Sequence, residues 1–314
     1  VQTCALPISG SIINKMEQNN KGLLYGMGGW AQLFFFIFLA FSGLIFTTLI
    51  ISLSGHLDEL NQSVKITRMA LTVQTAFFFI IPSLVFAFLS QSNTKEYLKI
   101  DESYNVTFLL LGVCLIIVIQ PLINFIGYYN QQIVLPESMS AIQTWMKENE
   151  LAAEKTTGLL FLDKSMAGLI LNLLIIAVVA GLGEELFFRG CLQQIIQKIV
   201  KNQHFAVWIA AIVFSAMHFQ FYGFIPRVLL GAVLGYMFVW SGTIWVPVVV
   251  HTVNNVIGVV LAFVYYGTPQ YEDLSVYSLE KNMWITILSL IFTVILIIFM
   301  YKKRYKTPEN AELR

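Results

Sequence analysis

The chain contains few charged residues and few cysteines. Of its 314 residues only 12% are Asp, Glu, Lys or Arg, whereas 57% are hydrophobic; soluble globular domains carry about 25% charged residues. The net charge of +1 provides no large basic surface for nucleic acid. The three cysteines form no disulfide framework, because Cys114 and Cys191 fall in or beside apolar segments. The sequence therefore excludes a nucleic-acid-binding protein and a small disulfide-stapled domain.

Long apolar runs instead predict an all-α, multi-pass membrane protein. A transmembrane helix needs about 20 mostly apolar residues. The basic tail "YKKRYK" after the last run is a signal for a cytoplasmic end, and an even number of spans puts both termini on that side. We expect about eight spans, at 30–52, 70–90, 106–129, 166–188, 204–220, 225–241, 244–266 and 284–301.

Polar residues divide the chain into parts. The opening "VQTCALPISGSIINK" lacks the charged start and apolar middle of a secretory signal, and we expect a non-native lead-in followed by a natural start near Met16. A polar connection at about 130–165 is expected to form a short surface helix, or an ordinary linker. The predicted parts are a lead-in (1–15), scaffold helices with the polar connection (16–164), a functional core (165–266) and the last span with its basic tail (267–314).

Two adjacent carboxylates in "GLGEELFFRG" need partners inside the membrane. A charged side chain there costs at least ~2.5–3.5 kcal/mol, so such residues are candidates for function. Arg189 follows Glu185 by four residues, the spacing at which an acid and a base pair on one helix face. Glu184 points about 100° away. We therefore expect Glu185 and Arg189 to pair, and Glu184 to meet a group on another helix.

Two further segments offer such groups. "FSAMH" places Phe214 and His218 one helical turn apart, and "HTVNN" does the same for His251 and Asn255. If the chain reverses near Lys201, Glu184 and His218 lie equally far from the turn and hence at the same depth. Further reversals near Tyr222 and Gly242 bring Asn255 within about one turn of that depth. We expect these side chains to line one cavity.

A carboxylate beside a neutral imidazole can take a proton from water and pass it to a leaving amine. His251 and Asn255 can donate hydrogen bonds to the oxyanion that forms during peptide hydrolysis. Phe214 is expected to be core or a wall of the cavity. The pattern thus favours hydrolysis without a covalent intermediate and without a cofactor.

Other interpretations of the same residues stay open. Intramembrane His and Asn commonly hydrogen-bond between helices without catalysing anything. Glu184, Glu185, His218 and His251 are also candidate zinc ligands, although the chain has no H-E-x-x-H. Ser215 precedes His218 by three residues but has no G-x-S-x-G around it. A proton relay or transporter would use the same cluster, but no repeat supports it.

The motifs "EELFFRG", "FSAMH" and "HTVNN" resemble, in order, those of the CPBP family, the CAAX prenyl protease 2 and bacteriocin-processing intramembrane glutamic endopeptidases, also called the ABI family. By this resemblance Glu184 and His218 activate water, His251 and Asn255 stabilise the oxyanion, and Glu185 and Arg189 support them. The substrate would be a peptide or membrane protein in the bilayer. A non-catalytic binding or immunity protein on the same scaffold is the alternative, and the membrane side to which the site opens is not determined.

Overall fold

The structure is a computed structural model, and it describes residues 22–91, 93–269 and 279–304. In this part of the chain every secondary-structure element is a helix, which confirms the predicted all-α class. The predicted lead-in, 1–15, lies outside the described residues, as do residues 305–314 of the basic tail. The main helices are α2 (Gly29–Leu53), α3 (Val64–Gln74), α4 (Ile81–Ser90), α5 (Thr94–Tyr97), α6 (Val106–Val118), α7 (Gln120–Gln131), α8 (Ser140–Phe161), α9 (Met166–Asn172), α10 (Ala180–Glu185), α11 (Gln193–Val200), α12 (Gln203–Ala216), α13 (Phe224–Ser241), α14 (Trp245–Tyr265) and α16 (Leu279–Lys303).

The apolar helices agree with a multi-pass membrane protein. Among the described residues six helices are long and apolar enough to cross a bilayer, and the bent pair α6–α7 makes up to seven. The pair bends by 43° after Val118, where Pro121 follows closely. Helix α12, with 14 residues, is a shorter apolar helix. Together these elements match the eight predicted segments, although α12 ends at Ala216 rather than near residue 220.

Two of the spans are long helices interrupted by wider, π-helical turns. Val64–Ser90 contains one such segment, η2 (Thr75–Ile80), and Met166–Val200 contains two, η4 (Leu173–Val179) and η5 (Leu186–Leu192). The acidic motif therefore stands on the short α10 between two π segments. Such interruptions change the direction of the side chains that follow and are frequent at functional sites.

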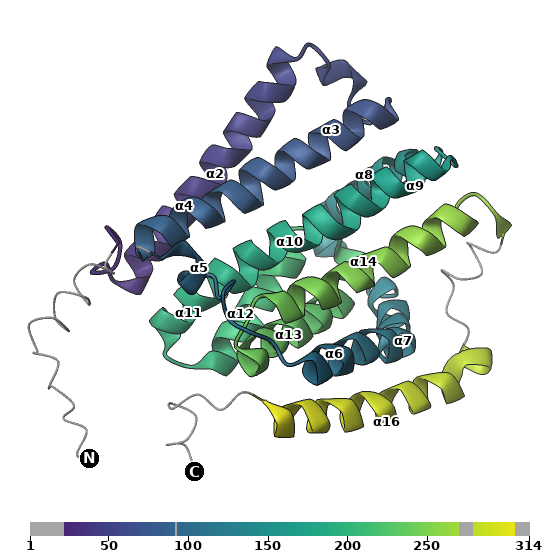
Figure 1. The fold of residues 1–314 in the computed structure, drawn as a ribbon. Helices are drawn as coiled ribbons and strands as arrows, with labels where there is room; N and C mark the ends of the chain where they lie inside the picture. Colours follow the sequence, from purple (N-terminus) through teal and green to yellow (C-terminus); the bar gives the residue numbers. More distant parts are fainter. Residues whose placement is uncertain (1–21, 92, 270–278, 305–314) are drawn as a thin grey trace, which may run out of the picture.

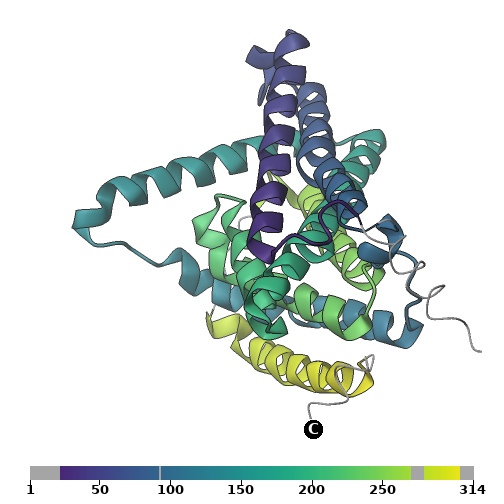
Figure 2. The same cartoon turned by 90° about the vertical axis from the view of Figure 1, so that its left-hand side faces the viewer.

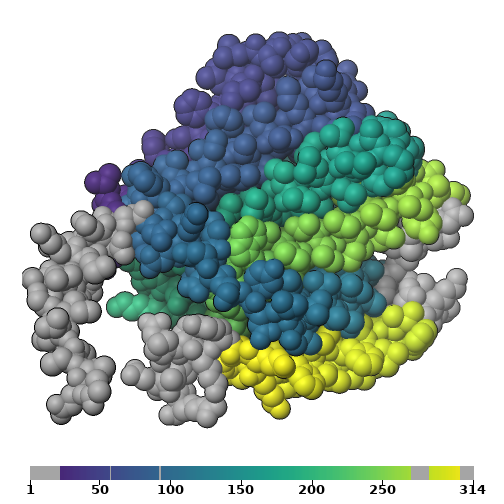
Figure 3. Space-filling model, in the orientation of Figure 1, coloured from purple at the N-terminus to yellow at the C-terminus, as the bar shows by residue number. Residues whose placement is uncertain are grey.

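Helix α14 occupies the middle of the bundle. It contacts α6, η4, α10 and α13, while α16 covers α6 and α7. Figures 1 and 3 show the resulting order, from the α2–α4 hairpin through α9–α11 and α14 to α6 and α16. His251 and Asn255 on α14 are thereby brought against the helix that carries the acids.

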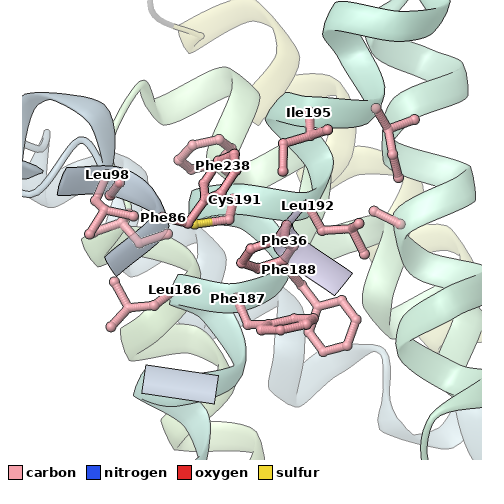
Figure 4. Packing of buried hydrophobic residues seen from close by; sticks show 14 of the residues in the cluster. Phe36, Phe86, Leu98, Leu186, Phe187, Phe188, Cys191, Leu192, Ile195 and Phe238 are labelled. Atoms are coloured by element: carbon pink, nitrogen blue, oxygen red, sulfur yellow. The ribbon is translucent and has the colours of Figure 1, made fainter. Parts of the chain in front are cut away.

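Buried aromatic residues hold the acidic motif against its neighbours (Figure 4). Phe187 follows the acids on η5, and its ring lies 4.6 Å from that of Phe36 on α2. Phe188, the next residue, packs its ring 5.1 Å from that of Phe214 on α12. The two neighbouring phenylalanines therefore pack η5 against α2 and α12, which fixes the helix direction at the site.

The predicted chain reversals are confirmed at two positions. Lys201 ends α11 in the left-handed conformation with φ 52°, and the Asn202 side chain caps α12. Gly242 ends α13 with φ 73°, a conformation that glycine adopts without strain. These turns place α11, α12, α13 and α14 in succession around the site.

The polar connection forms a longer helix than predicted. Helix α8 has 22 residues and extends away from the bundle in Figure 2. Its sequence "SAIQTWMKENELAAEK" consists largely of good helix formers without Pro or Gly, which explains the length. Trp145 packs on Phe221 at a ring distance of 5.2 Å, so α8 contacts the turn that follows His218.

The close approach of α2 to η2 gives a test of the packing. A Cβ on the buried Gly43 would overlap the carbonyl oxygen of Phe77, and backbone cannot move aside cheaply. We expect Gly43→Ala to lower the free energy of unfolding by about 1–3 kcal/mol. Gly258→Ala on α14 is the matched control, because nothing lies within 4 Å of its Cβ. Unfolding of the detergent-solubilised variants measures both, and equal stabilities would contradict this packing.

Candidate active site

The two acids at the end of α10 have different surroundings. Glu185 is fully buried, and its Oε1 accepts a hydrogen bond from Nη1 of Arg189 at 2.7 Å. The predicted pair is therefore present. The Glu184 side chain keeps 14% of its surface exposed and faces a cavity. One residue of helical rotation thus directs one carboxylate into the core and the other into open space.

Arg189 is held by groups from three helices. Besides Glu185, it donates Nη2 to the carbonyl oxygen of Gly231 on α13 at 2.7 Å. Its Cζ lies 5.1 Å from the centre of the Phe214 ring, within range of a cation–π contact. A Cβ at Gly231 would lie 3.2 Å from Cβ of Ala211, which explains the small residue there.

His251 connects the two acids, which the sequence did not reveal. Its Nδ1 lies 2.7 Å from Glu185 Oε1, and its Nε2 lies 3.7 Å from Glu184 Oε2. Because a carboxylate accepts only, Nδ1 carries the proton in the first contact. Glu185 therefore positions His251 as well as Arg189. No local spacing could have indicated this, since the two residues are 66 positions apart.

His218 lies in the turn just after α12. Its Nδ1 is 2.8 Å from the carbonyl oxygen of Phe214, so Nδ1 is the donor and Nε2 of the neutral ring is left as an acceptor. The Phe214 ring contacts both histidines, at ring distances of 5.0 Å to His218 and 5.8 Å to His251. Phe214, expected as core or wall, thus orients His218 through its backbone and packs its ring on both histidines.

Two cavities meet at His218. One, of about 320 Å³, is lined by Glu184, Thr75, Phe188 and His218, and we refer to it as the Glu184 cavity. The other, of about 270 Å³, is lined by His218, His251, Asn254, Asn255 and Arg227, and we refer to it as the Arg227 cavity. The residues predicted for catalysis therefore do not share one cavity as expected: Glu184 lines the first, His251 and Asn255 line the second, and His218 lines both.

Asn255 is partly engaged by other groups. Its Nδ2 donates to the carbonyl oxygen of Ile176 at 3.2 Å, and its Oδ1 accepts from Asn254 at 3.4 Å. One hydrogen of the amide therefore remains for a ligand. Gln120, expected to be scaffold, reaches the site by donating to Asn254 Oδ1 at 3.1 Å.

The alternative chemistries receive little geometric support. Ser215 donates its hydroxyl to the carbonyl oxygen of Phe224 at 2.8 Å. The buried Cys191 points its thiol at the carbonyl oxygen of Ser83 at 3.6 Å. No group of three or more His, Cys, Asp or Glu in the described part of the chain is arranged to hold a metal ion. The candidate zinc ligands Glu185 and His251 are directed at each other.

Arg227 is a site residue that sequence reasoning missed. It lies in the predicted span 225–241 and lines the Arg227 cavity. The rule that drew attention to Glu184, that a charge inside a span is a functional candidate, applies equally to Arg227.

The different surroundings of the acids predict different effects on stability. Glu185→Gln leaves the buried Arg189 without its counter-charge, and we expect a loss of about 3–5 kcal/mol in the free energy of unfolding. Glu184→Gln, the matched control one position away, should cost less than about 1 kcal/mol, because this side chain is partly exposed and its contact with His251 Nε2 is long, at 3.7 Å. Denaturation of the solubilised proteins compares them. A loss that is as large for Glu184→Gln would contradict the assignment.

Comparison with known proteins finds a family match over the segment that carries most of these residues. Residues 166–257 match the model of a family described as type II CAAX prenyl endopeptidase Rce1-like. A curated protein, Uncharacterized protein YpbD of Bacillus subtilis (strain 168), is 29% identical over 102 residues, which are 31% of this chain and 47% of that protein. The match thus spans about half the length of that relative. No solved structure matches the chain. We conclude that this multi-pass membrane protein carries an Rce1-like segment at residues 166–257. The three motifs of the chain resemble the same family.

Proposed function

We propose that this protein is an intramembrane endopeptidase that hydrolyses a peptide bond with water activated by Glu184 and His218. The observation that carries the proposal is the 2.8 Å contact of His218 Nδ1 with the Phe214 carbonyl oxygen. That contact leaves Nε2 as a proton acceptor on a residue that lines the same cavity as Glu184. A free imidazole nitrogen and a carboxylate beside one cavity that can hold water are the groups that general base catalysis requires.

Glu184 is the better of the two acids for this role. It is more accessible than Glu185, and its contact with His251 at 3.7 Å is too long for a direct hydrogen bond. Its carboxylate can therefore hold a water, take a proton from it and return the proton to the leaving amine. Glu185, held by Arg189 and His251, acts as support.

His251 and Asn255 are proposed as the oxyanion site. Because His251 Nδ1 donates to Glu185, a donor for the oxyanion requires a second proton on Nε2. The two carboxylates and Arg189 together carry one net negative charge, which that proton balances. The free hydrogen on Asn255 Nδ2 supplies a second donor. Two such donors near a tetrahedral intermediate stabilise its developing charge.

The proposed substrate is a peptide or membrane protein that reaches the site from the bilayer. An apolar cavity of about 560 Å³ lies beside the Glu184 cavity and shares Gln74, Phe79 and Met217 with it. It gives an apolar chain segment or lipid-like group a path from the hydrocarbon region. The family description, which names prenyl endopeptidases, supports the same class of substrate. No cofactor enters this scheme, so metal-independent hydrolysis is part of the proposal.

Removing either proposed base tests the function. We expect Glu184→Gln and His218→Gln to reduce cleavage by about 10²–10⁴-fold, because each removes a proton acceptor from the transition state. Glu154→Gln, the same change at an exposed position on α8, is the control. The measurement compares the termini of membrane proteins and peptides between cells that carry each form. A terminus present with the wild type and the control, but absent with both site variants, identifies the substrate. Cleavage that persists in Glu184→Gln would contradict the mechanism and favour a binding protein.

A further inference from the structure

Arg227 has no counter-ion at contact distance. Its guanidinium donates Nη1 to the backbone oxygen of Gln220 at 3.1 Å and Nη2 to the side-chain oxygen of Gln220 at 2.9 Å. Both acceptors are neutral. In the described part of the chain no carboxylate lies within 4.0 Å of Arg227. The second arginine of the site, Arg189, is buried and has such a partner in Glu185.

A cation at this position is unfavourable unless an anion binds beside it. Arg227 lies near the start of α13, where the free backbone N–H groups already carry partial positive charge. Ionisable residues within a span are rare and are candidates for function by default. The nearest acids act from a distance: Glu150 on α8, which accepts from the Tyr222 N–H at 3.4 Å, and Glu184. Packing alone does not explain an arginine here.

The place of Arg227 relative to the proposed chemistry indicates what it binds. His218, His251 and Asn255 line the Arg227 cavity together with it, while Glu184 lies in the other cavity. If the scissile carbonyl lies beside His251 and Asn255, the substrate residues next to the scissile bond extend into the Arg227 cavity. The guanidinium keeps N–H groups free beyond those given to Gln220, and its planar fork matches a carboxylate.

We propose that Arg227 binds a carboxylate of the peptide substrate in the Arg227 cavity, and so sets which peptides are held with their scissile bond at the site. The inference rests on the proposed endopeptidase function. The carboxylate comes from the free C-terminus of the peptide or from an acidic side chain near the scissile bond. Either source supplies the missing counter-ion, and Gln220 holds the guanidinium ready for it.

A binding measurement that needs no turnover tests this role. The full chain carrying Glu184→Gln, in detergent, is titrated with three N-acetylated apolar tetrapeptides. The first has a free C-terminus, the second a C-terminal amide, and the third is the amide with one internal glutamate. We expect the first or the third to bind at least about tenfold more tightly than the plain amide, since a charge-assisted bidentate pair is about twice as strong as a neutral one. Whichever of them binds tightly identifies the source of the carboxylate.

The same titration is then made with Arg227→Gln added. We expect the preference for a carboxylate to vanish, while Arg227→Lys keeps part of it, because lysine retains the charge without the fork. Each peptide partitions into detergent to the same extent with every variant, so this partition cancels when the preferences of the variants are compared. Glu150→Gln, which removes a nearby negative charge, should leave the preference intact or increase it. Thermal unfolding of each variant establishes that it is folded.

Three results would overturn the inference: equal binding of all three peptides, a preference that survives Arg227→Gln in folded protein, or a preference lost in Glu150→Gln. Failure of the proposed function can be distinguished from failure of this inference. If Arg227-dependent carboxylate binding is found but the wild type cleaves nothing, the endopeptidase is wrong and the anion site stands. If the wild type cleaves but binds carboxylate and amide peptides equally, only the role of Arg227 is wrong.

Discussion

One carboxylate oxygen organises this site. Oε1 of Glu185 accepts from Arg189 and from His251, both at 2.7 Å, in a fully buried position. The contact joins α10, η5 and α14, and Arg189 extends it to α13 through Gly231. In a bilayer each of these charged or polar groups would be costly alone. Their mutual satisfaction fixes three helices, Met166–Val200, α13 and α14, relative to one another and leaves Glu184 and His218 as the groups with accessible acceptor atoms.

In the proposed mechanism, the supporting and the reacting carboxylate stand at adjacent positions of one helical turn. Adjacent positions on a helix diverge by about 100°, so the two glutamates face different surroundings although they stand on the same helix. Phe214 contributes in two ways, because its ring contacts Arg189 and both histidines while its carbonyl oxygen orients His218. Substitution of a supporting residue should therefore affect folding and activity together, whereas substitution of Glu184 should affect activity alone.

Local spacing predicted much of this. The apolar runs predicted the spans, and the breaks between them predicted the turns at Lys201 and Gly242. The i, i+4 spacing predicted the Glu185–Arg189 pair. The contact between His251 and Glu185 was missed because it depends on how α14 packs against α10. The π segments were missed for a related reason: apolar periodicity does not distinguish a wide turn from a regular one. Arg227 could have been recognised, since an intramembrane charge is visible in the sequence alone.

The protonation of His218 decides the central claim, which is that its Nε2 is a free base beside Glu184. The chain has only four histidines, so nitrogen NMR of the detergent-solubilised protein with isotope-labelled histidine, with His218→Gln to assign the signal, can resolve this ring. We expect the neutral form of His218 to carry its proton on Nδ1, donated to the Phe214 carbonyl oxygen, with Nε2 unprotonated. A neutral His218 that carries its proton on Nε2 would leave Glu184 without an imidazole acceptor beside it and would contradict the account.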